Sequence, residues 1–204
     1  FNELDENTFK GKFFILCTSY EPDNYLCWEG FTKSINEKKE INYGACICCN
    51  KSALDIDVES MITETSALYK GFVCYDKEEQ TKIFMESLDN IYDLWSKGKN
   101  RCNIEYFIRK IIILHSIFYK DHYYYPEKEY RYVIDYEQLK LLKSDVKINQ
   151  INNCKYIEME IHDSTIKHVT IPSYSYKEIF KNYKLKLSKI SLNNDRPKKM
   201  IYEG

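Results

Sequence analysis

The stretch DKEEQTKIFMESLDNIYDLW, residues 76–95, with the segment IEYFIRKIIILHSIFY, residues 104–119, decides the fold class. In the first segment, apolar side chains recur with helical spacing at Phe84, Leu88, Ile91 and Trp95. Asp76 is suited to cap the start of this helix and Gly98 to end it. The second segment carries a broad apolar stripe with His115 at its edge, a position typical of a core or rim histidine. The sequence therefore predicts two central helices, at about residues 77–96 and 104–119.

Segments with strand character lie on both sides of this helical pair. Apolar runs and alternating aromatic and β-branched residues predict strands at residues 13–17, 43–49, 69–75, 123–134, 156–161, 166–171 and 184–192. Short helices are predicted at residues 25–34 and 174–183. The continuous apolar run of residues 13–17 predicts a strand that is buried on both faces. This order predicts a single α+β domain over residues 1–204, with a mixed, largely antiparallel sheet and two central helices.

The composition excludes several classes of protein. The chain has 204 residues with 44% hydrophobic residues, which suits one domain with its own core and excludes wholesale disorder. Only 6 Gly and 4 Pro are present, which excludes collagen-like and low-complexity chains. The formal charge of −1 shows no overall basic field for nucleic acid, and no apolar run approaches the roughly 18 residues of a membrane span. Because the chain begins with Phe1 and has no signal-peptide core, we expect a further segment upstream.

Eight cysteines allow three interpretations. Most of them lie in apolar runs that a sheet would bury, which favours reduced core thiols and a reducing cytoplasm. The cluster of Cys46, Cys48 and Cys49 leaves a metal or redox site as the second interpretation. A disulfide framework is the third, although such frameworks are typical of smaller secreted chains. Since the cluster has no second chelating pair, no bound metal is expected.

The segment EKEYR, residues 127–131, is the most informative for chemistry. On an extended strand, Glu127, Glu129 and Arg131 project to one face, while Tyr130 and Tyr132 project to the other. Burying this charged row without partners would cost several kcal/mol, so the row must face solvent or a polar cleft. One interpretation is a solvated sheet face that carries a Glu129–Arg131 pair. The other is a catalytic carboxylate site.

The catalytic interpretation uses the hydroxyl pair Thr18 and Ser19, which ends the first predicted strand. A strand ending in hydroxyl residues, together with a Glu-x-Glu on another strand, resembles the pattern of ADP-ribosyltransferases. The resemblance implies that Ser19 and Thr18 shape an NAD pocket and that Tyr20 or another aromatic residue stacks on the nicotinamide. It also implies that Glu129 stabilises the oxocarbenium-like ribose as the glycosidic bond breaks, while Glu127 orients the acceptor.

In this resemblance Arg131 supports the NAD site. The chain departs from the pattern in two respects. Ser19 and Glu129 are 110 residues apart, so the two central helices would be an insertion between the motifs. The pattern also places an Arg upstream of the Ser motif, and no Arg precedes Ser19 in this chain.

Several segments together are similar to an uncharacterised bacterial and phage family, the domain of unknown function numbered 2971. The resemblance rests on FILCTS, residues 14–19, on NYLCW, residues 24–28, on GACI, residues 44–47, and on KDHYYYPEKEYR, residues 120–131. The family pattern differs where it has Tyr and His after the helix Trp, since this chain has Gly30, Phe31 and Thr32 there. It also begins with a Lys-Tyr-Arg-like strand, which this chain lacks. The resemblance implies relatives rather than a reaction.

Two functions from different classes follow. The first is an enzyme similar to ADP-ribosyltransferases or NAD glycohydrolases, acting as a toxin or phage-defence effector on NAD and a nucleotide or protein acceptor. The second is a non-enzymatic module that contacts an anionic partner or nucleic acid through the basic stretch of residues 177–199. That stretch has eight basic residues against Glu178 and Asp195, for a local charge of +6, and a solvated helix-and-strand face is the alternative interpretation of it. No membrane partner is expected, and the sequence does not define an oligomeric state.

Overall fold

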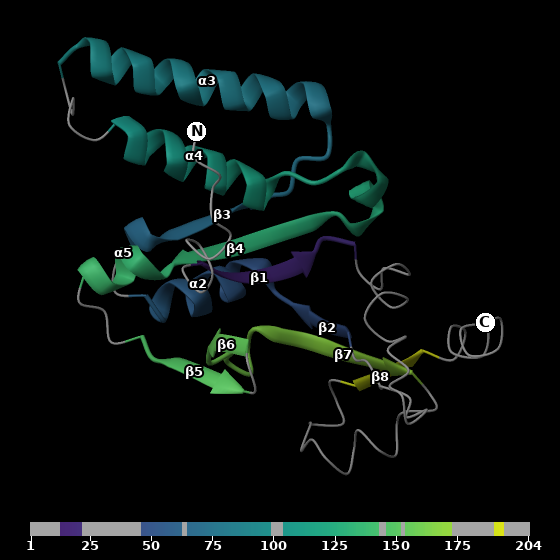
Figure 1. The fold of residues 1–204 in the computed structure, drawn as a ribbon. Helices are drawn as coiled ribbons and strands as arrows, with labels where there is room; N and C mark the ends of the chain where they lie inside the picture. Colours follow the sequence, from purple (N-terminus) through teal and green to yellow (C-terminus); the bar gives the residue numbers. More distant parts are fainter. Residues whose placement is uncertain are drawn as a thin grey trace. The chain divides into compact units, whose positions relative to one another are not determined.

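The computed structural model describes residues 13–21, 46–62, 65–98, 104–142, 146–151, 154–172 and 190–193. Helices and small, mostly antiparallel sheets make up these ranges, and the α+β class predicted from the sequence is confirmed (Figure 1). The helices are α2 (Lys51–Ser60), α3 (Lys77–Ser96), α4 (Ile104–Phe118) and α5 (Tyr136–Leu141), with short 3₁₀ helices η2 (Thr65–Ala67) and η4 (His122–Glu127). The strands are β1 (Phe13–Ser19), β2 (Cys46–Cys49), β3 (Leu68–Phe72), β4 (Glu129–Asp135), β5 (Ile148–Ile151), β6 (Cys154–Ile157), β7 (Ile166–Pro172) and β8 (Ile190–Asn193).

The chain divides into two compact units. Unit 1 contains residues 1–15, 21–69 and 132–204, and unit 2 contains residues 16–20 and 70–131. Three strands pair in the order β1-β4-β3, and the boundary between the units falls within these strands. Unit 2 therefore holds the end of β1, the start of β4 and both central helices.

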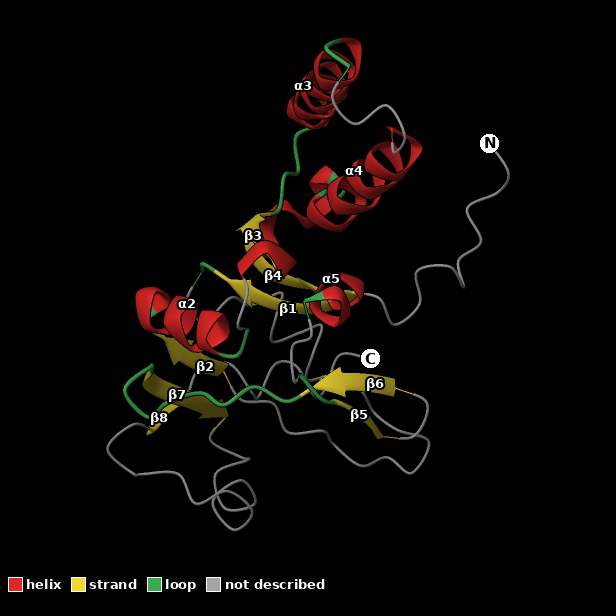
Figure 2. Cartoon of the chain, turned by 90° about the vertical axis from the view of Figure 1, so that its left-hand side faces the viewer, coloured by secondary structure: helices red, strands yellow, loops and turns green. Residues whose placement is uncertain are grey.

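The helical pair of unit 2 forms as the sequence predicts. Asp76 caps α3 by accepting a hydrogen bond from the Glu79 amide at 2.8 Å, and the left-handed Gly98, with φ of 73°, follows its end. α3 and α4 lie side by side (Figure 2), and the rings of Phe84 and His115 meet edge to face with centroids 5.5 Å apart. Two neighbouring hydroxyl groups are also in contact with the imidazole of His115, those of Ser87 and Tyr119. This histidine is a hydrogen-bonded rim residue of the helical pair.

The strand predicted over residues 123–134 is wrong in its first half. Residues His122–Glu127 instead form η4, whose start is capped by Asp121 through a 2.9 Å bond from the Tyr123 amide. The end of η4 is marked by Lys128, a non-glycine residue with a left-handed φ of 45°, after which β4 begins. The tyrosine-rich composition favours a strand, but the Asp121 cap and the fixed φ of Pro126 favour a helical turn.

Unit 1 is built around two further sheets. β2 pairs antiparallel with β7, β7 pairs parallel with β8, and β5 pairs antiparallel with β6. Buried apolar side chains form a core cluster in this unit, at Ile62, Ala67, Ile134 and Leu139. Asn50 caps α2 by accepting bonds from the Ser52 and Ala53 amides. The sequence patterns predicted neither α2 nor α5.

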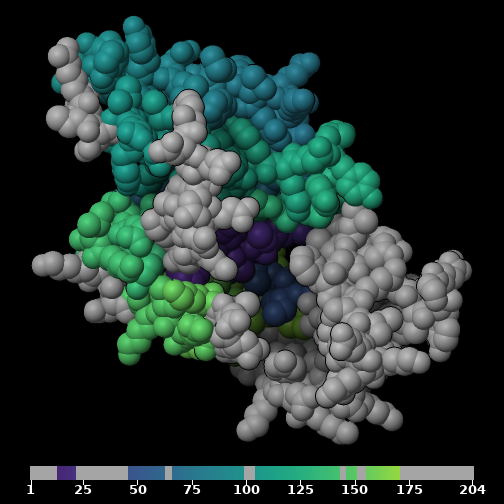
Figure 3. All heavy atoms as spheres, in the orientation of Figure 1, coloured from purple at the N-terminus to yellow at the C-terminus, as the bar shows by residue number. Residues whose placement is uncertain are grey.

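The first strand is more exposed than its apolar sequence predicts. Ile15 is 46% exposed and Leu16 is 37% exposed, so the prediction of burial on both faces is wrong. Atoms of β1, in purple, are visible at the surface in the space-filling view (Figure 3). Sheet position explains the difference, because β1 is an edge strand in the order β1-β4-β3, whereas β4 is central and its Tyr130 is buried.

The cysteines are also less buried than we expected. Cys17 is exposed, whereas Cys48, Cys49 and Cys74 are half-buried, and all four carry free thiols. The expected helices at residues 25–34 and 174–183 lie outside the described residues, as does most of the strand predicted at residues 184–192.

Candidate functional site

The hydroxyl residues at the end of β1 are hydrogen-bonded to the segment that carries the two glutamates. Ser19 Oγ donates to the Glu127 carbonyl at 2.8 Å, and Thr18 Oγ1 donates to the Tyr130 carbonyl at 2.9 Å. The amide of Tyr20 donates to the Lys128 carbonyl at 3.0 Å. Both sequence motifs therefore meet within unit 2, although 110 residues separate Ser19 from Glu129 in the chain.

Four charged side chains form a connected group, which we call the charged cluster: Lys120, Glu127, Glu129 and Arg131. The Lys120 ammonium group pairs with Glu127 and lies 3.2 Å from Glu129 Oε1. On the other side of Glu129, Arg131 Nε donates to Oε2 at 2.7 Å. The two carboxyl groups therefore share the Lys120 ammonium group as a partner. With side chains only 12–24% exposed, these ion pairs are screened by water less than surface pairs are.

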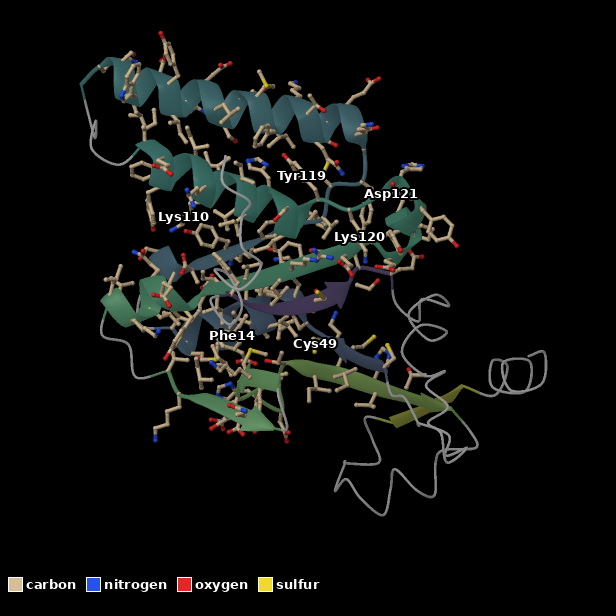
Figure 4. All side chains as sticks on the ribbon, viewed as in Figure 1. Phe14, Cys49, Lys110, Tyr119, Lys120 and Asp121 are labelled. Carbon is tan, nitrogen blue, oxygen red and sulfur yellow. The ribbon has the colours of Figure 1, made fainter. Side chains whose placement is uncertain are left out.

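Neighbouring elements hold the charged cluster in place. The Arg131 guanidinium also donates to the carbonyl of Ile117 in the last turn of α4, where such a carbonyl has no helical partner. The Glu129 amide donates to the hydroxyl of Tyr75 at 3.0 Å. Lys120 follows α4 directly, and Figure 4 shows it between that helix and the start of β4. The end of α4, the turn η4 and the strand β4 thus converge on Glu129.

Electrostatics keep the central carboxylate and its lysine partner charged. Burial alone would raise the pKa of Glu129, but the hydrogen bonds and charges of Arg131 and Lys120 outweigh burial and hold this pKa below its ordinary value. Burial would likewise lower the pKa of Lys120, but the bonds and charges of Glu127 and Glu129 raise it. Both groups are therefore ionised at neutral pH. Although Cys17 has an exposed surface, partial desolvation of its thiol, reinforced by the charge of Glu129, raises the pKa of this thiol, which stays protonated.

The sheet separates the candidate residues onto two faces. Tyr130 lies between Glu129 and Arg131 in β4, so its ring projects to the opposite face. The ring of Tyr20 contacts Tyr130 and Phe72, with centroid distances of 5.9 and 4.8 Å, and so belongs to that opposite face. The aromatic ring beside the charged cluster is that of Tyr124, whose centroid lies 4.7 Å from Lys120 Nζ. Tyr20, the ring predicted to stack on nicotinamide, is thus placed away from Glu129.

Three residues of this site were not predicted from the sequence: Lys120, Tyr75 and Tyr124. Lys120 reaches both glutamates because η4 folds the chain back between residues 120 and 129. The spacing of seven residues to Glu127 fits two helical turns, but the spacing of nine to Glu129 does not, so no single period predicts that Lys120 reaches both glutamates. The available signal was charge, since a buried pair of glutamates needs cations near it.

The other candidate sites are placed as follows. Within the ranges that the structure describes, no three His, Cys, Asp or Glu side chains are placed to hold a metal ion together. Cys46, Cys48 and Cys49 lie in β2, where Cys48 is paired in register with His168 of β7. Of the basic stretch 177–199, only residues 190–193 are described. Among the described helices, none has the length and apolar character that crossing a bilayer requires.

The charged cluster is suited to a specific kind of chemistry. An ionised carboxylate that is already oriented stabilises positive charge that develops next to it, because little reorganisation is needed when the charge forms. Glu129 is such a group, since Arg131 and Lys120 fix both of its oxygens. Comparison of the chain with protein-family models, with curated proteins and with solved structures finds no match.

Proposed function

We propose that unit 2 carries the NAD site of an ADP-ribosyltransferase-like enzyme, in which Glu129 stabilises the ribose cation. The bond between the nicotinamide nitrogen and ribose C1′ breaks, and its electron pair leaves with nicotinamide. Water or an acceptor nucleophile then forms the new bond to C1′. The observation that carries the proposal is the ionised Glu129 carboxylate, oriented by Arg131 next to the strand that ends in Ser19.

The other candidate residues take supporting roles in this proposal. Glu127 shares the Lys120 ammonium group with Glu129, and this position beside the catalytic carboxylate suits a group that orients the attacking acceptor. Ser19 bonds to the carbonyl of Glu127 and Thr18 to that of Tyr130, so the two hydroxyl groups hold the chain on both sides of Glu129. The free thiols support a reducing cytoplasm as the site of action. A role as a toxin or phage-defence effector is part of the same proposal.

A nicotinamide-release assay with purified full-length protein tests the proposal. The protein should consume NAD, and Glu129→Gln should lower the rate by about 100-fold or more, because the neutral amide no longer stabilises the cation. The matched control is Glu86→Gln on α3, a glutamate that is 62% exposed and 4.0 Å from Lys82, and its rate should be unchanged. Circular dichroism and urea unfolding confirm that each variant is folded.

A second variant separates cleavage from transfer. Glu127→Gln keeps the Arg131–Glu129 pair, so it should still release nicotinamide in water while losing transfer to an added acceptor. The proposal is overturned if wild-type protein neither binds nor cleaves NAD, or if folded Glu129→Gln retains the wild-type rate.

A further inference from the structure

Lys120 connects the two glutamates of the proposed site. Its ammonium group pairs with both Glu127 and Glu129, whereas Arg131 pairs with Glu129. The three side chains are 24%, 23% and 12% exposed, so water screens their charges only in part. Two carboxylates this close repel each other unless a cation lies between them.

The backbone of Lys120 is itself held in place. Its amide donates to the Cys74 carbonyl at 3.1 Å, and its carbonyl accepts a bond from Gln80 Nε2 at 2.9 Å. The same Gln80 amide group donates to the Cys74 carbonyl at 2.7 Å, so a side chain of α3 joins the two segments. The ring of Tyr124 lies over the ammonium group. The position of the ammonium group is therefore set by contacts with α3, the segment after β3 and η4.

We infer that Lys120 is a positioning residue of the proposed site, which holds the carboxyl groups of Glu127 and Glu129 together beside Ser19. The inference rests on the proposed function for its catalytic consequence, but the arrangement of the two carboxylates does not depend on it. Lys120 acts through the glutamates and makes no bond to the reacting atoms. Without it, one carboxylate takes up a proton or moves away from the other.

Several titratable groups face Glu129, and any test by pH has to include them: Lys120, Glu127, Arg131, Cys17 and Tyr75. The test variant is Lys120→Met, which keeps the length of the side chain and removes the charge. Lys120→Arg restores the charge, and Lys82→Met, at an exposed lysine on α3, is the matched control. If Lys120→Met does not fold, Lys120→Gln replaces it.

The first measurement is the titration of ¹³C-labelled glutamate carboxyl groups by NMR, with Glu129→Gln and Glu127→Gln used for assignment. In Lys120→Met the midpoint of Glu129 should rise by about one pH unit, and Lys120→Arg should restore it. The control Lys82→Met should leave the midpoint unchanged. This measurement needs no enzyme activity, so it tests the inference separately from the proposed function. If the titration midpoint of Glu129 is unchanged in a folded variant that lacks the Lys120 charge, the inference is overturned.

The second measurement is the pH profile of nicotinamide release. Lys120→Met should lower kcat/KM by about 100-fold at neutral pH through misplacement of the carboxylates. The acid limb of the pH profile of Lys120→Met should also move to higher pH, by the same amount as the NMR midpoint of Glu129. A merely structural role for Lys120 predicts a lower rate with an unchanged acid limb, and that result also contradicts the inference. A midpoint shift without any NAD cleavage by wild-type protein supports the positioning role and overturns the proposed function alone.

Discussion

Replacing Arg131 with methionine removes the guanidinium group that joins Glu129 to the end of α4. The substitution keeps an unbranched side chain of similar length, so most of the packing is preserved. It removes the ion pair to Glu129 Oε2 and the hydrogen bond to the Ile117 carbonyl. We predict that the free energy of unfolding at pH 7 falls by about 2–3 kcal/mol.

This magnitude follows from the burial of the pair. Removing one partner of a buried ion pair costs about 3–5 kcal/mol, whereas an exposed pair contributes about 0.2–1 kcal/mol. Arg131 is 13% and Glu129 12% exposed, which places the pair near the buried limit. Lys120 remains beside Glu129 in the variant and offsets part of the loss. The cost of about 3–5 kcal/mol already includes the hydrogen bonds of the removed partner, such as that to Ile117, so the net loss is about 2–3 kcal/mol.

The pH dependence identifies charge as the cause. The folded-state pKa of Glu129 is held below its unfolded value, mainly by Arg131 acting against burial. Its stabilising contribution is therefore present above the unfolded pKa, about 4.3, and is lost as pH falls through the folded pKa. The difference in the free energy of unfolding between wild type and Arg131→Met should have its full size at pH 7 and should become smaller below about pH 4.

Urea unfolding followed by fluorescence between pH 7 and pH 3 measures this difference. Arg109→Met is the matched control, because Arg109 pairs with Glu105 on the exposed side of α4, and it should change stability by about 0.3–0.5 kcal/mol. Two results would refute the assignment of the effect to this buried pair. One is a loss of unfolding free energy in Arg131→Met as small as that in Arg109→Met, and the other is a difference between wild type and Arg131→Met that stays constant down to pH 3.

Two further predictions concern unit 1. Leu139→Ala should lower the free energy of unfolding by about 2–4 kcal/mol, because Leu139 is 1% exposed within the core cluster; Leu141→Ala, at a residue that is 76% exposed, should change it by less than about 0.5 kcal/mol. The hydrogen bond and charge of Asp57 raise the pKa of His162 in the folded protein. Below the unfolded pKa of about 6.5, wild type should therefore have a larger free energy of unfolding than His162→Gln, and this advantage should disappear as pH rises through the folded pKa. Equal differences between wild type and His162→Gln at pH 6 and pH 9 would contradict this assignment.

The helical pair could be predicted because its signals are local. The apolar spacing in residues 77–96, the Asp76 cap and the Gly98 stop all lie within or next to α3. The same reasoning missed α2, a helix of 10 residues with little amphipathic pattern, although Asn50 is a good capping residue. Short helices depend on tertiary packing, which a sequence window does not contain.

The site was predictable only in part, for the same reason. Strand alternation correctly places Glu129 and Arg131 on one face, and their pair forms. Glu127 joins them by a different route, since it ends η4 and does not belong to β4. Lys120 enters the site only because α4 ends where it does and η4 folds back.

The left-handed conformation of Lys128 has a consequence for comparing related sequences. The turn between the two glutamates depends on a φ of 45°, which glycine, asparagine and aspartate tolerate well and β-branched residues strongly disfavour. A homologous chain with valine or isoleucine between its glutamates could retain both acids and still not bring them together in this way. The identity of the middle residue therefore helps to decide which Glu-x-Glu sequences can share this geometry.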